Sequence, residues 1–474
     1  MKENQSSRDK NELKDLLGKY QSLKHGQPNS FLEEEAFERI IDYYDEKEDM
    51  SAALEAVEYG ILQYPYSSLL LVKKADLFIA TRKYNDALKL LEKVELLDRK
   101  DVNVFILKTD AYLALDQQKK AANILEDAIT IFEGEEKIDL LFELADVYDD
   151  YEQFEKVFNC LCLILDQDPV NEEALYKICF WTDFTGRNEE SIKLHQRIIE
   201  EHPFTELAWF NLGAAYQGIK LYEKAVDAYL YALAIDEKFD YAYRNLGDAY
   251  LRMRKYREAI EALQKVLELS RPEDVIYEAI GHAYDKLKNY AQARFNYRKA
   301  SHLNPDDSHL YYKIACTYMN EQYWESGLKN LENAMRIQRS QPEYNFAMGK
   351  CYSELGKTKE AVIYFSNFIK SRPKSIKGWK ELIKCLYKAK FYDEALTQVY
   401  NAEKNTSENA LIAFYKCSIL FADGKSTKAL LTLETALEKF PGKLKYLLEL
   451  NPALLQNQHV VDLISKAKRN NSSR

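Results

Sequence analysis

Acidic side chains recur at a fixed interval near the start of this 474-residue chain. Asp42, Asp76 and Asp110 are separated by 34 residues each, and Asp146 follows after 36. If the fold stacks these acids, their like charges reinforce a potential of one sign, and such a potential steers oppositely charged partners. These residues therefore offer recognition by charge, provided that the elements carrying them lie side by side.

Residues with the spacing of a catalytic or metal site are missing from the sequence. It has no phosphate-binding glycine loop, no His-Glu-x-x-His and no Gly-x-Ser-x-Gly motif. Cys160 and Cys162 have no partner pair, so they are interpreted as structural thiols. His195 falls in a core position, whereas His282 and His309 are interpreted as surface polar groups with a pH-sensing or ligand-binding alternative. No catalytic residue, cofactor or metal is expected.

Composition describes a folding chain with an acidic balance. It is 46% hydrophobic and 30% charged, and its formal net charge is −10. The negative charge argues against general nucleic-acid binding. Glycine (15) and proline (10) are scarce, which predicts helices whose turns seldom need a left-handed residue. The 35 tyrosines are an unusual excess.

Location is predicted from what the sequence lacks. The first twenty residues contain no apolar stretch of the kind found in signal peptides. No segment is long and apolar enough for a membrane span, and the seven cysteines suggest no disulfide framework. We therefore expect a cytoplasmic protein without membrane insertion.

A 34-residue pattern returns along most of the chain. With Glu206 as position 1 of a unit, nine of the twelve residues at position 20 are Ala. Position 8 is mostly small, position 11 is often aromatic, and position 32 is Pro in six units. Much of the tyrosine excess therefore belongs to the repeat.

One unit reads as a helical hairpin. Positions 4, 7, 8 and 11 share one face of a first helix, and positions 20, 24 and 27 share one face of a second. Small residues at positions 8 and 20 allow the two axes to approach closely. Proline at position 32 ends the second helix. A single hairpin cannot bury its own faces, so neighbouring units must stack.

These residues resemble the tetratricopeptide repeat family. The motif of that family is matched in order by Trp209, Leu212, Gly213, Tyr216, Ala225, Tyr229 and Ala232, and again by Tyr243, Leu246, Gly247, Tyr250 and Ala259. The resemblance implies an all-α superhelix (solenoid) whose first helices line a concave groove, and a role in binding peptides or extended protein segments.

The resemblance predicts three parts. Residues 34–443 form twelve repeats with a two-residue insertion at 136–137, where the units from 138 onward resume the phase. Residues 1–33 are expected to hold a polar tail, loose over residues 1–8, and a short helix. Residues 444–474 are expected to hold capping helices and a loose tail.

The family's groove positions are 2, 5, 6, 9, 12 and 13, and they define the candidate partner-binding residues. These are Glu35, Glu38, Asp42, Asp76, Asp110, Phe142, Asp146, Tyr176, Phe210, Asn211, Asn245, Tyr312, Phe346, Lys377, Lys380 and Lys384. The expected groove is acidic at one end, aromatic in the middle and basic at the other. Its expected partner is an extended segment with a basic end, apolar anchors and an acidic end.

Four functions follow from this pattern. The first is a non-catalytic protein-binding scaffold of a cytoplasmic, bacterial type. The second is an accessory subunit of an envelope assembly or folding pathway. The third is an enzyme built from groove groups such as Asp248, His282 and Asp285, and the fourth is an RNA binder that uses the lysines of residues 377–388. A carboxylate clamp of the chaperone-tail type is not supported, because Val275 and Ala279 stand where its cations belong.

Overall fold

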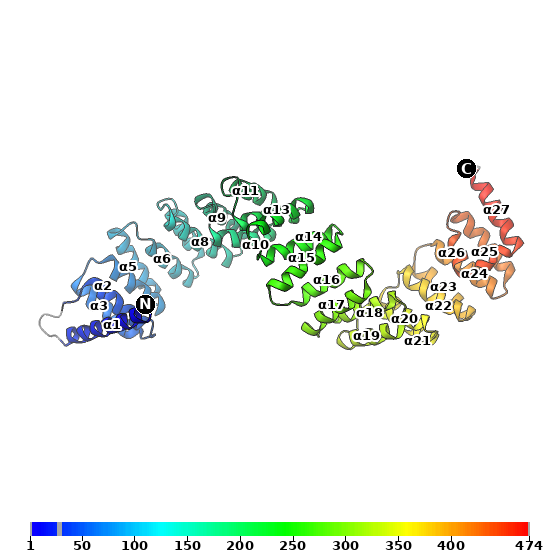
Figure 1. Ribbon diagram of the computed structural model, residues 1–474, viewed down its shortest axis with the longest axis horizontal. Helices are drawn as coiled ribbons and strands as arrows, with labels where there is room; N and C mark the ends of the chain where they lie inside the picture. The colour runs from blue at the N-terminus through cyan, green and yellow to red at the C-terminus, as the bar shows by residue number, and fades with distance from the viewer. Residues whose placement is uncertain (1, 26–30, 473–474) are drawn as a thin grey trace. The chain divides into compact units, whose positions relative to one another are not determined.

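The computed structural model describes residues 2–25 and 31–472, and in that part of the chain the regular structure is helical. Twelve consecutive helix pairs occupy most of these residues (Figure 1). The first helices are α2 (Glu34–Asp45), α4 (Ser68–Ala80), α6 (Val102–Ala114), α8 (Glu135–Asp150), α10 (Glu172–Thr185), α12 (Glu206–Gly218), α14 (Asp240–Arg252), α16 (Asp274–Lys286), α18 (Ser308–Asn320), α20 (Pro342–Glu354), α22 (Ile376–Lys388) and α24 (Ala410–Ala422).

The second helices pack against the first. They are α3 (Met50–Gln63), α5 (Tyr84–Leu97), α7 (Gln118–Ala128), α9 (Phe154–Gln167), α11 (Asn188–Glu201), α13 (Tyr222–Ile235), α15 (Tyr256–Leu269), α17 (Tyr290–Leu303), α19 (Trp324–Ile337), α21 (Thr358–Ser371), α23 (Tyr392–Asn405) and α25 (Ser426–Lys439). The all-α class with consecutive helical hairpins, predicted from the 34-residue period, is confirmed.

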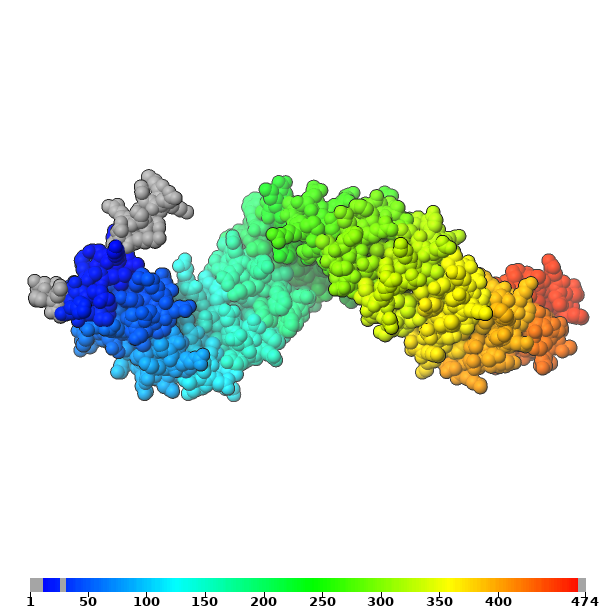
Figure 2. All heavy atoms as spheres, turned by 90° about the horizontal axis from the view of Figure 1, so that it is seen from below, coloured from blue at the N-terminus to red at the C-terminus, as the bar shows by residue number. Residues whose placement is uncertain are grey.

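The chain forms two compact units, Met1–Ala242 and Tyr243–Arg474. Within each unit the helix pairs follow one another in sequence order, from blue to green in the first unit and from green to red in the second (Figure 2). Inside either compact unit, each pair contacts the next, so the buried faces merge into shared clusters. The largest cluster of the first unit runs from Leu71 to Ala208. Stacking therefore supplies the core that a single hairpin lacks.

Close helix approach explains the small residues of the repeat. A Cβ added at Gly213, position 8 of its unit, would lie 2.6 Å from the ring of Tyr229. The facing position-20 residue, Ala225, is fully buried. Position 20 is also buried where it is not Ala, at Val157, Ser191 and Gly327. The repeat therefore selects size at these positions, because the partner helix leaves no further room.

The turns within the pairs correct one expectation. We predicted from the scarcity of glycine that few turns need a left-handed residue, and this is wrong. Position 15 of every unit has positive φ, and glycine occupies it at Gly186, Gly356 and Gly424. The other nine are Glu48, Arg82, Asp116, Glu152, Lys220, Arg254, Lys288, Gln322 and Lys390. A non-glycine residue in this conformation has a steric cost because of its Cβ. The packing of the two flanking helices imposes the conformation despite that cost.

In the six repeats with proline at position 32, the second helix ends two residues before that proline, as predicted. α11 ends at Glu201, two residues before Pro203, because the residue preceding a proline disfavours helical backbone. The indole Nε1 of Trp209 then donates to the Pro203 carbonyl at 2.9 Å. Trp379 makes the same bond to Pro373 at 2.8 Å. An aromatic at position 4 thus fixes the connection to the preceding unit.

The two-residue insertion lengthens a first helix. Gly134 adopts φ +64°, and α8 begins directly after it, at Glu135. With 16 residues, α8 is longer than the 13-residue helices α4 and α6. Glu136 and Lys137 therefore add to the start of this helix, and the spacing of the later units is preserved.

Additional helices flank the pairs. α1 (Lys2–Lys24) packs on α2. Residues 1–8 were expected to be a loose tail, but residues 2–8 belong to this helix. Residue 1 lies outside the described residues. Tyr20 of α1 is buried beside Tyr44 and Tyr59. At the other end, α26 (Lys445–Leu450) packs on α24, and α27 (Gln458–Ser472) packs on α25 after a short 3-10 helix (Pro452–Gln456). The loose tail was expected over residues 469–474, but residues 469–472 belong to α27, and residues 473–474 lie outside the described residues. Among the described helices, none has the length and apolarity to cross a bilayer.

The contact between Gly213 and Tyr229 predicts a size limit. We expect Gly213→Ala to lower the free energy of unfolding by about 1–3 kcal/mol, because the added methyl group overpacks the helix pair. The control is Gly18→Ala in α1, where a Cβ meets nothing within 4 Å and helix propensity favours Ala by about 1 kcal/mol. Thermal unfolding of the full chain measures both, and equal effects would contradict the packing argument.

The left-handed turn residues predict a gain from glycine. Lys220 has φ +64°, so Lys220→Gly removes the Cβ strain and should stabilise the fold by up to about 1 kcal/mol. Lys220→Ala is the matched control, since it removes the charge but keeps Cβ and should give no gain. If both substitutions raised the unfolding midpoint equally, the lysine side chain and not the backbone would be the cause.

Candidate functional site

In the first compact unit, Met1–Ala242, the first helices of successive repeats place the acids together. α2 packs on α4, α4 on α6, and α6 on α8. Charge interactions link Asp76 to Asp42 and Asp45, and Asp110 to Asp76. Farther along, Glu143 of α8 interacts with Asp110 and Asp146. We call Asp42, Asp76, Asp110, Glu143 and Asp146 the acid row; Glu143 occupies position 6 of its repeat, one of the positions predicted to face the groove.

Repulsion and lost hydration act in the same direction along the acid row. Partial burial, followed by the charge of Asp76, raises the pKa of Asp110 above its usual range. Partial burial also raises the pKa of Glu143, and Asp110 and Asp146 add to the effect. Asp76 and Asp146 remain exposed to solvent, yet the protein around them displaces enough water to raise each carboxyl pKa. Among the described residues, neither Asp110 nor Glu143 has an ion-pair partner.

Two lysines already use the acid row as a cation site. The ammonium of Lys73 lies 2.6 Å from Asp42 and 3.9 Å from Glu38, on the neighbouring first helix. Lys177 of α10 lies 2.8 Å from Glu173 and 3.9 Å from Asp146. Cations therefore bind between successive first helices at both ends of the row. The predicted residue Glu35 is exposed in the first turn of α2.

The predicted aromatic residues of the first unit differ in exposure. Tyr176 of α10 is 68% exposed. Phe142 is half-buried, with the Lys177 ammonium 5.0 Å from its ring. Phe210 is buried against Phe239, at 5.0 Å between ring centroids. Tyr176 and Phe142 are therefore accessible to a partner, and Phe210 belongs to the interior.

Asn211 is also an interior residue. It is 2% exposed, and its amide Nδ2 donates to the Leu175 carbonyl at 2.7 Å and lies 3.2 Å from His195 Nε2. The other ring nitrogen of His195 lies 2.8 Å from the Ser191 carbonyl. Burial lowers the pKa of His195 to about 4, so the ring is neutral near pH 7. This network joins α10, α11 and α12 and leaves Asn211 no access to a partner; Asn245 is half-buried.

In the second unit, the predicted aromatic residues lie among other rings. Tyr312 is half-buried, 5.7 Å from His309 and 5.1 Å from Tyr344 between ring centroids. Phe346 is half-buried against Phe365 and Phe368. These rings are partly accessible from the first-helix side, and none is fully exposed.

The three predicted lysines are close together but already engaged. The Lys377 ammonium lies 4.1 Å from the ring centroid of Phe346. Lys380 and Lys384 share the carboxylate of Glu449 from α26, at 2.7 Å and 3.5 Å. Hydrogen bonding and charge from these lysines outweigh burial, so the pKa of Glu449 is lowered. The C-terminal segment thus supplies the basic end with an acidic side chain of its own.

Sequence reasoning missed an exposed aromatic row on α10. Phe180 and Phe184 are 60% and 56% exposed, and they follow Tyr176 at intervals of four residues on one helix face. They occupy positions 9 and 13 of their unit, which the family pattern assigns to the groove. We searched position 9 for charge, and an aromatic search of the same positions would have found both residues. We call Tyr176, Phe180 and Phe184 the aromatic row.

The residues described by the structure support no metal site. No group of three or more His, Cys, Asp or Glu residues among them is arranged to hold a metal ion. Burial raises the pKa of Cys160 and Cys162 to about 12, so both are neutral thiols near pH 7. All seven cysteines are free. The arrangement suits binding by charge and aromatic surface.

Comparison with known proteins identifies the repeats. Models of the tetratricopeptide repeat match residues 207–239, 241–271, 275–307 and 344–375. No protein of curated function matches the chain.

Several solved structures are similar to parts of this chain or to most of it. YrrB, described as a TPR protein with an unusual peptide-binding site, is 19% identical over 39% of this chain and 95% of its own, with a TM-score of 0.36. The C-terminal part of a TPR repeat-containing protein from Cytophaga hutchinsonii is 13% identical over 54% and 99%, with a TM-score of 0.44. The Cut9–Hcn1 hetero-tetramer of the APC/C contains a chain that is 12% identical over 92% and 97%, with a TM-score of 0.31.

Repulsion in the acid row predicts a pH-dependent gain from removing a charge. The folded-state pKa of Asp110 is raised, so its charge destabilises the fold at neutral pH, and this cost disappears as pH falls through the raised pKa towards about 4. We expect Asp110→Asn to stabilise the full chain by about 0.5 kcal/mol at pH 7 and to have no effect near pH 4.

The control is Asp227→Asn, on the exposed face of α13. It should leave the unfolding midpoint unchanged at both pH values. A loss of stability in Asp110→Asn at pH 7 would show that Asp110 is favourably paired and would contradict the repulsive row.

Proposed function

The chain is a tetratricopeptide repeat protein, and from that premise we propose that it is a non-catalytic scaffold that binds an extended protein segment along the exposed side chains of its first helices. Proteins of this family generally serve as protein–protein interaction scaffolds. The observation that carries the proposal is the acid row, whose members come from four successive first helices and share one electrostatic field.

A cost in stability supports a binding role for the acid row. Partial burial, with the neighbouring like charges adding to it, raises the carboxyl pKa values of Asp110 and Glu143, so their charged forms destabilise the folded state at neutral pH. Natural proteins retain such arrangements where function requires them, since neutral substitutions are readily available. A cationic partner would remove the repulsion on binding. In a complex, the acids would be stabilised by the charges of the partner. In the free chain they have no such stabilisation.

The lysines of the second compact unit, Tyr243–Arg474, support a partner segment that has an acidic end. Lys380 and Lys384 of α22 both bind the carboxylate of Glu449 from α26. Tyr415 of α24 also interacts with Glu449. An acidic side chain of a partner would meet the same groups and would compete with Glu449 for them. Charge selection of opposite sign in the two units is therefore part of the proposal.

Site-specific photo-crosslinking tests the proposed binding face. A benzophenone amino acid replaces exposed Asp149 on first helix α8, and in a matched variant it replaces exposed Lys193 on second helix α11. We expect irradiation in lysate, followed by mass spectrometry, to attach a discrete protein to the Asp149 variant. Attachment of the same protein to the Lys193 variant alone would place binding on the second helices and contradict the proposal.

A further inference from the structure

The aromatic row on α10 is an exposed apolar surface. Tyr176, Phe180 and Phe184 are each more than half exposed. On the neighbouring first helix α12, positions 9 and 13 carry Ala214 and Gly218, which are too small to cover the rings. Exposed large aromatics gathered on one face mark interaction sites, because their apolar surface is otherwise left in water.

The base of the aromatic row is fixed by packing. Trp181 is buried and stacks on Phe154 of α9 at 5.5 Å between ring centroids. Phe184 meets the same Phe154 edge-on at 4.8 Å, and Phe180 lies 5.8 Å from Phe184. A cavity of about 430 Å³ lies beside them, lined by residues 152–156 and by Phe184 and Thr185. A partner side chain would thus meet rings whose positions are already set.

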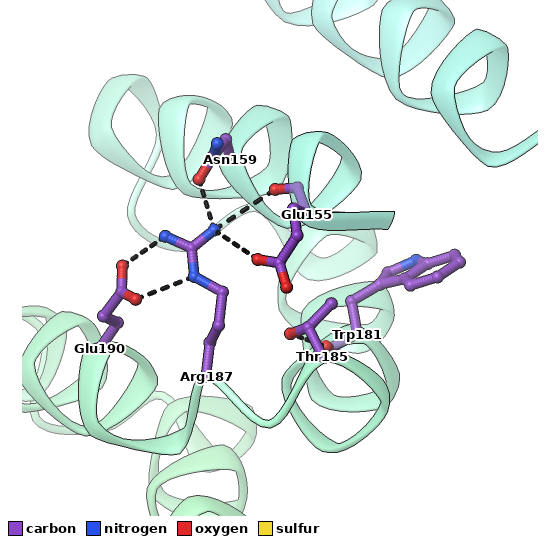
Figure 3. Close-up of polar contacts among 6 residues, drawn as sticks. All are labelled: Glu155, Asn159, Trp181, Thr185, Arg187 and Glu190. Carbon is purple, nitrogen blue, oxygen red and sulfur yellow. Dashed lines mark hydrogen bonds and ion pairs between the residues drawn. The ribbon is translucent and has the colours of Figure 1, made fainter. Parts of the chain in front are cut away.

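Arg187 holds the end of α10 in place. Its guanidinium donates to Asn159 Oδ1 at 2.5 Å and to the Glu155 carbonyl at 3.3 Å, and it pairs with Glu190 of α11 (Figure 3). The same group lies 4.3 Å from the ring centroid of Phe158. Arg187 therefore joins α9 to α11 across the turn that follows α10. The turn that directly follows the helix carrying the aromatic row is therefore held by contacts with both α9 and α11.

Charge around the aromatic row selects the partner. Asp183 lies on α10 itself, and Asp146, Asp149 and Asp150 lie exposed on α8. Lys177 shows that a cation fits in this environment. Its ammonium lies between Glu173 and Asp146 and faces the ring of Phe142. A cation beside an aromatic ring and between carboxylates is favoured by both interactions. The four exposed carboxylates would repel an acidic partner.

We propose that the first unit binds a cationic segment of a partner protein, with arginine or lysine side chains on the acid row and a large apolar side chain on the aromatic row. This inference rests on the proposed function and names the partner chemistry for one unit. Neighbouring helix axes lie about 8–10 Å apart, and an extended chain advances about 3.3–3.6 Å per residue. The recognised residues therefore recur about every third position: cation, cation, apolar anchor.

Synthetic peptides of this pattern test the proposal on the full chain. One fluorescent peptide of about twelve residues carries two arginines and then a tryptophan, each separated by two neutral residues, and a second carries them in reverse order. We expect one of the two to bind in fluorescence anisotropy, with affinity that weakens as salt increases. A peptide with glutamate in place of both arginines should not bind.

Matched variants locate the binding. The double substitution Phe180→Ala and Phe184→Ala should weaken the arginine–tryptophan peptide about tenfold. The control pair, Phe295→Ala and Ile363→Ala, removes similarly exposed apolar side chains from second helices and should have no effect. Asp110→Asn combined with Asp146→Asn should weaken binding and reduce its salt dependence.

The outcomes separate this inference from the proposed function. Equal binding of the glutamate peptide, or an unchanged affinity in Phe180→Ala with Phe184→Ala, overturns the inference. If neither arginine peptide binds but the Asp149 photo-crosslink succeeds, the first helices bind a partner of another chemistry, and only the inference fails. If the peptides and the first-helix crosslink both fail, the proposed function fails with it.

Discussion

The structure depends on the close approach of two helices within each repeat. Gly213 has no Cβ, and the ring of Tyr229 occupies the space where one would be. The same relation holds at Gly281 with Tyr297 and at Gly349 with Phe365. In these hairpins a glycine of the first helix faces an aromatic ring of the second helix, and the ring fills the space between the two helices. The next pair can then pack on the hairpin, and the stacking continues along each unit.

This packing also sets the backbone of the turns. The short connection between two closely packed helices needs one left-handed residue, and the structure uses residues such as Lys220 and Arg254 as readily as Gly186. The steric cost at each turn is of order 1 kcal/mol. This cost is small beside the free energy gained when one pair buries its apolar surface. Tertiary packing therefore overrides the local preference. Glycine scarcity predicts helices correctly but gives no information about these turns.

Stacking gives the proposed binding face its chemistry. Since each pair contributes one first helix, a residue type repeated at one position becomes a row across several helices. The acid row arises in this way from Asp76, Asp110 and their neighbours. The aromatic row has a different origin, because its three rings lie along the single helix α10. The two rows meet near Asp146 and Lys177, where charge and apolar surface are available to one segment.

The sequence by itself determined the helical hairpins, their 34-residue period and the acids that recur with it. These features repeat, and a repeated pattern is readable without knowing any contact. Only the tertiary structure decided which candidate side chains remain accessible. Phe210 and Asn211 turn into the core, and Lys380 and Lys384 meet Glu449, which lies more than sixty residues later in the chain. Such outcomes depend on the neighbour that each side chain meets, and a period within one chain does not encode that neighbour.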